Sequence, residues 1–208
     1  MKFSRALKLF TRHGSLRVRF SQYGEDTIIR KHFNKSEGFY IDVGAHHPFR
    51  QSNTASLWLQ GWQGVNVDAN SESVEVFKKV RPNDSNVWSA IVSEDFAENN
   101  RFVDFYTSKS IDLCATASAE LAADRGASLV KPVPCTSLDK IINTYAPSGG
   151  RKIDFLNIDI EGLDEVAIES IAKWGSFPTM IAIETYVETI SDVLGTSTYK
   201  LLAEAGYE

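Results

Sequence analysis

FYIDVGAHHPF, residues 39–49, and GVNVDAN, residues 64–70, are two short apolar runs that each contain an acidic residue near the end of the run. The acids are Asp42 and Asp68, and helix-forming sequence follows both runs. Such a pair is typical of neighbouring parallel strands in a Rossmann-like sheet that binds a nucleoside at its carboxyl edge. In this interpretation Gly44 lets the backbone approach a ligand closely, and Asp68 accepts the two hydroxyl groups of a ribose.

From about residue 38 onward, strand-like and helix-like segments alternate, which predicts a mostly parallel sheet with helices on both faces. The predicted strands are 39–43, 64–68, 87–92, 153–160 and 180–185, with a half-exposed edge strand or hairpin at 102–108. The predicted helices are about 52–60, 71–79 (capped by Asn70 or Ser71), one that begins at 137–142 with Ser137 as its cap, about 163–174, and 197–205 before a stop at Gly206. Residues 109–135 are predicted to form a short helix and a loop that cover the site.

The length of 208 residues suits one α/β domain with a sizeable core. We expect this domain to span residues 21–208 and to follow a basic segment, residues 1–20. A doubly wound sheet normally has one or two strands beyond the last helix of this chain. The sequence therefore predicts a sheet that lacks its last strand or strands, in a reading frame that is truncated or short at its C-terminus.

The net charge of −5, with both signs mixed through most of the chain, gives no reason to expect a nucleic acid partner. The basic segment 1–20 predicts a lead-in helix packed on the domain, or a helix that contacts a membrane surface. No apolar run is long enough for a membrane span or a secretory signal, and Cys114 and Cys135 do not form a disulfide or zinc pattern. These features predict a cytoplasmic protein.

The turn after the first strand separates two kinds of nucleoside ligand. A dinucleotide requires three glycines beside its pyrophosphate, whereas the turn DVGAHHPFR has one glycine, a bulky His47 and a proline. S-adenosylmethionine fits better because Asp42 would offset its ammonium while backbone N–H groups after Gly44 receive its carboxylate. A strand end of this kind also occurs in proteins that bind no ligand there. The spacing alone therefore leaves open whether this turn binds S-adenosylmethionine or no ligand. The predicted cofactor-binding residues are Asp42, Gly44 and Ala45 at the amino acid end, Asp68 and Ala69 at the ribose, and Ser89 and Ala90 beside the adenine.

Six motifs resemble, in the same order, those of the FkbM family of S-adenosylmethionine-dependent methyltransferases. They are SQYGEDTII (21–29), FYIDVGAHHPFRQSNT (39–54), GWQGVNVDAN (61–70), RPND (81–84), CTSLDKI (135–141) and IDFLNIDIEGLDEVAI (153–168). The resemblance implies a class I methyltransferase fold and O-methylation of a hydroxyl on a sugar or another small or cell-surface molecule. His46, His47 and Pro48 depart from many relatives, which carry a second small residue there.

Methyl transfer from a sulfonium is an in-line displacement, so alignment of the acceptor is the main catalytic task. A hydroxyl acceptor must also lose a proton, which a carboxylate or an imidazole can take. We expect Asp159 and Glu161, at the end of a strand, to face the sulfonium and the acceptor, and Glu184 reaches the same edge. His46 is a further candidate base or hydrogen-bond donor.

Two more groups of residues have a functional and a structural interpretation. Adjacent histidines in a turn rarely converge on one ion, so His46 and His47 predict no metal site. Gln22 and Glu25 precede a helix, where they either cap it or belong to a lid that touches the cofactor.

Two other classes of protein remain as alternatives: a nucleotide-binding oxidoreductase and a non-catalytic binding protein.

Overall fold

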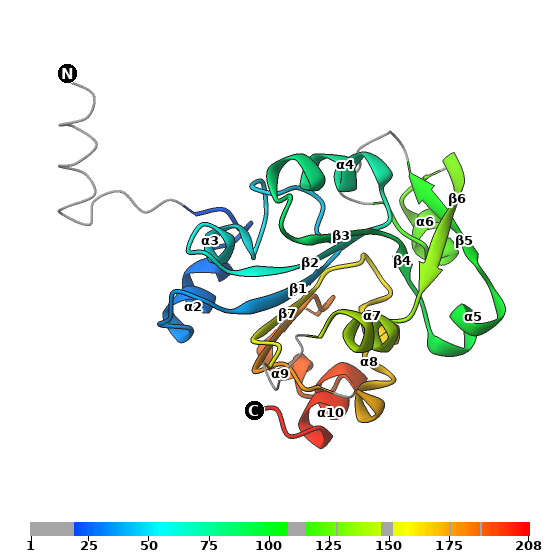
Figure 1. The fold of residues 1–208 in the computed structure, drawn as a ribbon. Coiled ribbons are helices and arrows are strands. Elements are labelled where there is room, and N and C mark those ends of the chain that lie inside the picture. The colour runs from blue at the N-terminus through cyan, green and yellow to red at the C-terminus, as the bar shows by residue number, and fades with distance from the viewer. Residues whose placement is uncertain (1–18, 108–114, 128, 147–151, 175, 188) are drawn as a thin grey trace.

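The computed structural model describes residues 19–107, 115–127, 129–146, 152–174, 176–187 and 189–208 (Figure 1). The predicted basic segment therefore lies almost wholly outside the described residues. The same is true of Cys114 and of the PSGG sequence at 147–150.

A parallel sheet forms the centre of the fold and confirms the predicted α/β class. In the described residues it has five strands in the order β3-β2-β1-β7-β8. They are β1 Phe39–Val43, β2 Gln63–Asp68, β3 Ser85–Trp88, β7 Phe155–Ile158 and β8 Met180–Ile183. In the register of the sheet, Asp42 of β1 lies between Asn66 of β2 and Asn157 of β7. The order reverses at β1, so the carboxyl ends of β1, β2 and β7 enclose a crevice.

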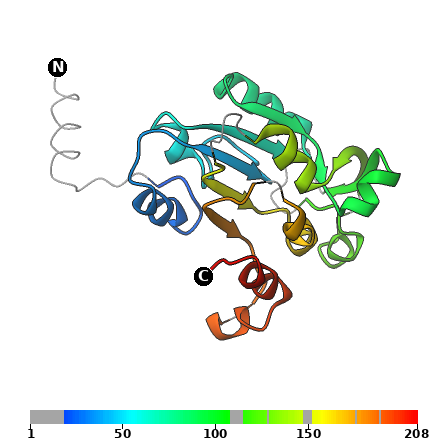
Figure 2. The same ribbon diagram turned by 60° about the horizontal axis from the view of Figure 1, so that its bottom comes forward.

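Helices cover both faces of this sheet (Figure 1 and Figure 2). One face carries α2 Glu25–His32, α3 Ala55–Trp58 and α4 Ser71–Val80, and the other carries α7 Leu138–Tyr145, α8 Asp164–Ile168, a 3-10 turn at Ile171–Lys173 and α10 Ser197–Glu204. Side chains alternate between the faces, so Tyr40 packs toward α2 and α3 whereas Ile41 joins the core beneath α7 and α8. Each large apolar side chain buried this way contributes about 1.5–3 kcal/mol.

A second, smaller sheet adjoins the first and differs from prediction. It has the order β4-β6-β5, with β4 Ala90–Ile91, β5 Phe102–Thr107 and β6 Leu129–Thr136, and α5 Glu94–Asn99 and α6 Ala119–Asp124 lie in its connections. The prediction of one strand over 87–92 was wrong, because two strands of different sheets share this segment. The chain leaves the main sheet at Ser89, after the end of β3, and β4 then pairs with β6.

The predicted helix in 109–135 exists as α6, but the end of that region is a strand, β6. Pro132 and Pro134 argue against a strand because proline cannot donate to a ladder. β4 pairs only with Cys135 and Thr136, so the two prolines lie where one side of β6 is an open edge and tolerates them.

Smaller differences concern the lengths of helices. The predicted helix 163–174 divides into α8 and the 3-10 turn, with Ser170 between them. Helix α3 is shorter than the predicted 52–60, and α9 Ile190–Val193 was not predicted. Asn70 caps α4 as predicted, since its side chain accepts from the N–H of Glu72, whereas the Ser137 side chain accepts no capping hydrogen bond in α7.

At the far side of the main sheet, β8 is the edge strand of the described residues. Helix α10 packs against the core on one face of the sheet. After this helix, the Tyr207 hydroxyl donates to the Pro178 carbonyl at 2.7 Å. The predicted truncation stays a prediction. Among the described residues no helix has the length and apolar character that crossing a bilayer requires.

Candidate active site

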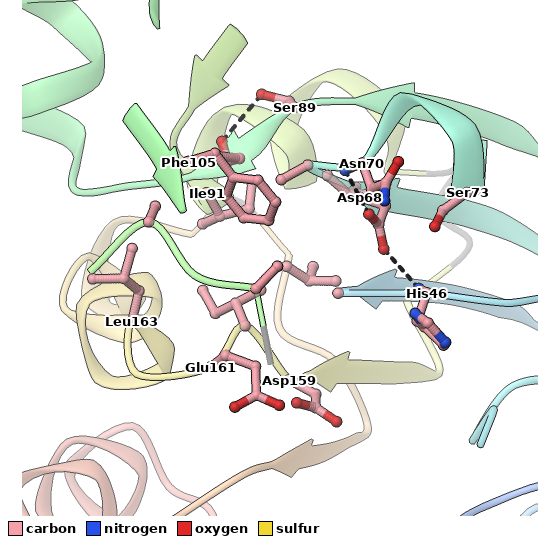
Figure 3. Close-up of a pocket in the computed structure, with 18 of the residues that line it drawn as sticks. His46, Asp68, Asn70, Ser73, Ser89, Ile91, Phe105, Asp159, Glu161 and Leu163 are labelled. Carbon is pink, nitrogen blue, oxygen red and sulfur yellow. Dashed lines mark hydrogen bonds between the residues drawn. The ribbon is translucent and has the colours of Figure 1, made fainter. Parts of the chain in front are cut away.

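A cavity of about 270 Å³ opens at the carboxyl ends of β1, β2 and β7 (Figure 3). Its walls come from both sheets, because Ile91 and Phe105 belong to the smaller sheet and Gly44, Asp68 and Asp159 follow strands of the larger one. This is the edge at which an open α/β sheet binds its ligand.

Asp68 is the last residue of β2 and faces the cavity with a fixed carboxylate. One of its oxygens accepts from the backbone N–H of His46 and the other from that of Asn70, both at 2.7 Å (Figure 3). Burial raises the pKa of Asp68 to about 6, and these two hydrogen bonds limit the rise. The group is therefore ionised at neutral pH, and each oxygen keeps a lone pair for a ligand hydroxyl.

An apolar slot lies beside Asp68, where the chain changes from one sheet to the other. Ile91 and Phe105 project into the cavity from the smaller sheet (Figure 3), and Ser89 and Ala90 line it at the end of β3. The Ser89 hydroxyl donates to the Pro134 carbonyl at 3.1 Å and thereby ties the slot to β6. A flat aromatic base fits such a slot, since apolar walls bury its faces.

Asp42 does not face this cavity. It is 2% exposed, and its carboxylate accepts from the Thr54 hydroxyl at 2.5 Å and from the Asn157 amide at 2.9 Å. Burial raises its pKa, while these hydrogen bonds oppose the rise. Asp42 lies on the same face of β1 as Tyr40, which α3 covers, so it supports the turn from below and is not among the described residues that line the cavity.

The backbone N–H groups of the turn also have partners within the chain. Gly44 and Ala45 both donate to the Val67 carbonyl, at 2.9 and 3.1 Å, and His47 donates to Ala45. With His46 bonded to Asp68, the N–H groups predicted to receive a carboxylate are already used. The side chains of the turn are therefore the groups that remain for a ligand.

Gly44 is required where the turn crosses the end of β7. Its φ is +78°, and a Cβ built on it would lie 1.6 Å from the Asp159 carbonyl oxygen. His46 and Gln51 have φ of 51° and 54°, a left-handed conformation that costs residues with a side chain about 1–2 kcal/mol, and both line the cavity. Strain of this kind concentrates at functional sites.

The two histidines of the turn have different environments. His47 uses its Nδ1 to accept from the N–H groups of Phe49 and Arg50, at 3.0 and 3.1 Å, so its ring shapes the turn. His46 lines the cavity, and burial, followed by the charge of Arg50, lowers its pKa. Its imidazole is therefore neutral at pH 7 and able to accept a proton.

Three carboxylates meet at the opposite wall of the cavity. Ligand oxygens of Asp159, Glu161 and Glu184 lie within 4.8 Å of one another, and all three residues line the cavity. Burial and then the charges of Glu184 and Glu161 raise the pKa of Asp159 above its ordinary value. With its pKa raised toward neutral pH, the carboxylate form of Asp159 is a stronger base than an ordinary carboxylate, which suits a group that takes a proton from a hydroxyl.

Tyr186 and Arg125 complete this acidic group. The Tyr186 hydroxyl lies 2.9 Å from Glu161 and 2.7 Å from Glu184, and Arg125 pairs with Glu161 at 2.8 Å. The tyrosine hydroxyl therefore bridges the two carboxylates. Arg125 gives Glu161 a cationic partner, whereas burial and the charges of Glu184 and Glu161 raise the pKa of Asp159.

The model of the FkbM methyltransferase domain matches residues 42–208. The chain belongs to the FkbM methyltransferase family. No curated protein and no solved structure matched. Membership confirms the resemblance read from the sequence and supports a methyltransferase over an oxidoreductase.

In this FkbM methyltransferase, the predicted site residues separate into two groups. The structure brings together at the cavity Gln22, Gly44, His46, Asp68, Ala69, Ser89, Ala90, Asp159 and Glu161. Asp42, Ala45 and Glu25 are outside the described cavity lining, and Glu25 instead accepts from the Tyr23 N–H at 2.9 Å at the start of α2.

Several residues that line the cavity were not predicted. They are Gln51, Asn70, Ser73, Ile91, Phe105, Ala115, Ala117, Ile160 and Leu163, besides Val43 and Val67. Asn70 was recognised only as a helix cap, and no pattern in the sequence indicated that β5 would face the main sheet. The Ser73 hydroxyl is buried beside Asp68 and has no hydrogen-bond partner among the described residues, which is an opening for a ligand.

The FkbM methyltransferase cavity also has a set of groups that a metal could use. The three carboxylates are close enough to hold one hard cation, and this set contains neither of the two adjacent histidines. Acidic residues at a surface often gather without an ion. The absence of a metal site at the histidines stays a prediction.

Proposed function

We propose that this methyltransferase uses S-adenosylmethionine and methylates a hydroxyl of a small-molecule or glycan acceptor. The observation that carries the proposal is the position of Asp68, a fixed, ionised carboxylate between an apolar slot and a strained polar turn. The three regions correspond to the ribose, the base and the amino acid end of this cofactor. A dinucleotide would need its pyrophosphate beside the turn, where His46 and Gln51 stand instead.

In this proposal each part of the cavity has one task. Asp68 accepts the ribose hydroxyls, and the slot of Ile91 and Phe105 holds the adenine. The amino acid end lies toward His46 and Gln51. Asp159, whose backbone touches Gly44, offers this end of the cofactor the carboxyl group that was predicted for Asp42.

The chain contributes to the reaction mainly by holding groups in place. S-adenosylmethionine supplies an electrophilic methyl group, whose bond to sulfur breaks, leaving the electron pair on sulfur, as the acceptor oxygen bonds to carbon. The carboxylate of Asp159 takes the acceptor proton, because burial and the charges of Glu184 and Glu161 raise its pKa and make it a stronger base than an ordinary carboxylate. Glu161, held in place by its ion pair with Arg125, orients the acceptor hydroxyl.

Binding can be tested before any acceptor is known. We expect S-adenosylmethionine and S-adenosylhomocysteine to raise the melting temperature in a concentration-dependent way, and NAD not to raise it. Asp68→Ala should abolish the increase. Glu161→Ala should retain it, and Glu204→Ala, at an exposed position of α10, serves as the matched control. A folded wild-type sample that shows no increase would overturn the proposal.

Turnover distinguishes an enzyme from a non-catalytic binding protein. We expect label from methyl-labelled S-adenosylmethionine to appear on hydroxylated acceptors in a panel of glycans and small molecules. Glu161→Ala should lose at least about tenfold in turnover, which is the usual size of a lost proton-transfer or orienting group. A cytoplasmic location and the lack of a nucleic acid partner remain predictions.

A further inference from the structure

Arg81, which lies behind the cavity, is the most deeply buried cation of the described residues. It is the C-terminal cap of α4, and its side chain is 0% exposed. The guanidinium lies 5.0 Å from the Phe77 ring centroid, 5.6 Å from that of Trp58 and 5.8 Å from that of Tyr40. Burying a cation costs several kcal/mol unless hydrogen bonds offset the loss of water, so its partners show what it does.

The partners of Arg81 lie on two sides. Its Nη1 donates to the Tyr40 hydroxyl at 2.9 Å and to the Asn66 side-chain oxygen at 3.2 Å, which are groups of β1 and β2. Its Nη2 donates to the Pro48 carbonyl and, at 3.4 Å, to the Ser52 hydroxyl, which are groups of the turn. A single planar guanidinium therefore connects the sheet to the turn.

Of the turn residues that Arg81 holds, Pro48 lies between the two strained positions and Ser52 directly follows the second. Pro48 follows His46 and precedes Gln51, and the latter two have a positive φ and line the cavity. Strained conformations persist only where the surroundings fix them. The carbonyl of Pro48 is fixed by Arg81, and Thr54, which supports Asp42, accepts from the same Nη1 at 3.0 Å.

The sheet alone does not explain this arrangement. Arg81 Nε is buried without a hydrogen-bond partner among the described residues, so the guanidinium is not fully compensated. An apolar side chain of similar volume would fill the space beside Phe77 and Trp58. It would leave the buried Asp42 without the positive charge that lowers its pKa, and the Pro48 carbonyl without a donor.

We propose that Arg81 is a positioning residue for the amino acid end of the cofactor, because it fixes the shape of residues 46–51 from inside the fold. This inference rests on the proposed function. Arg81 touches neither the cofactor nor the acceptor. It acts through His46 and Gln51. The ribose and adenine regions are built mainly from Asp68, Asn70 and the second sheet, and they share with the turn only the His46 N–H that Asp68 accepts.

Two ligands separate this role from a general contribution to stability. S-adenosylhomocysteine has the amino acid end, and 5′-methylthioadenosine lacks it but keeps the nucleoside. We expect Arg81→Lys, which keeps the charge and loses the fork, to weaken S-adenosylhomocysteine binding about tenfold in calorimetry and 5′-methylthioadenosine binding by less than about twofold. Equal losses for both ligands would show that Arg81 only stabilises the fold, and would overturn the inference.

Two further variants keep the test decisive if Arg81→Lys does not fold. Ser52→Ala removes an acceptor on the turn side of Arg81 and should lower the affinity for S-adenosylhomocysteine selectively, by about threefold. Tyr40→Phe removes an acceptor on the sheet side and should lower the melting temperature while leaving the ratio of the two affinities unchanged. The opposite pattern would refute the role of Arg81. A wild-type protein that binds neither ligand would refute the proposed function itself.

Discussion

At the scale of single residues, the two acids of the opening motif have different fates. Asp68 is the last residue of β2, so its side chain meets the cavity. Asp42 is followed by Val43 within β1, and the alternation of the strand directs it into the face that α3 covers. The sequence indicated both acids at strand ends, but a difference of one residue in where a strand ends decides which of them can reach a ligand.

Gly44 offers a prediction about the same turn. We expect Gly44→Ala to lower the free energy of unfolding by more than about 3 kcal/mol, because its Cβ would overlap the Asp159 carbonyl oxygen and its φ is left-handed. Gly126→Ala is the matched control, since Gly126 also has a positive φ but nothing lies within 4 Å of the added Cβ. That variant should lose only about 1 kcal/mol. Urea denaturation measures both, and equal losses would contradict the close approach.

At the scale of elements, the alternation of apolar and amphipathic segments predicted every strand of the main sheet. Burial on both faces makes those strands continuous apolar runs, which are easily recognised. The smaller sheet escaped prediction for physical reasons. The chain bends at Ser89, in a run that is otherwise apolar, and β6 contains two prolines that are tolerated because one of its sides is open there. Pairing between distant segments of this kind leaves no local pattern.

Two polar contacts with Glu161 tie the segment that contains helix α6 to the site. Arg125 pairs with the Glu161 carboxylate at 2.8 Å, and the Thr116 hydroxyl donates to the Glu161 carbonyl at 2.6 Å. We expect Arg125→Ala to increase amide hydrogen exchange in residues 116–126 about two- to fivefold, which corresponds to an ion pair worth up to about 1 kcal/mol.

The control for this prediction is a second ion pair, in which no residue of α6 takes part. Lys173→Ala breaks the pair of Lys173 with Glu94, 2.5 Å long, and should leave exchange in residues 116–126 unchanged. Exchange in α6 that did not respond to Arg125→Ala would mean that apolar contacts alone, such as Leu121 against Gly162, hold the helix.

At the scale of the whole molecule, the cavity and the start of α8 beside it contain carboxyl groups that are hard to ionise. Burial is the first cause that raises the pKa of Asp68 and of Asp164, each to about 6, and it also raises the pKa of Asp159. The folded chain therefore keeps protons that the unfolded chain has released above about pH 4. Because the folded state binds more protons, these groups make the free energy of unfolding fall as the pH rises from about 4 to 8. The pKa values of His46 and His47 are lowered, so these two residues make the free energy of unfolding rise with pH. They do so only below the ordinary pKa of histidine.

We therefore expect the protein without ligand to melt at a higher temperature at pH 5.5 than at pH 8, and Asp159→Asn to reduce that difference. At pH 8 this variant should melt about 2 °C higher than the wild type, because it removes a charge that Glu184 and Glu161 repel, while exposure to the cavity limits the gain. Glu98→Gln, an exposed change in α5, should keep the wild-type dependence. Calorimetry across this pH range measures all three proteins. An Asp159→Asn protein with the wild-type dependence and a lower melting temperature would mean that Asp159 stabilises the fold. In that case the repulsion between Asp159 and the two glutamates would be absent, although the proposed reaction needs it to make Asp159 a strong base.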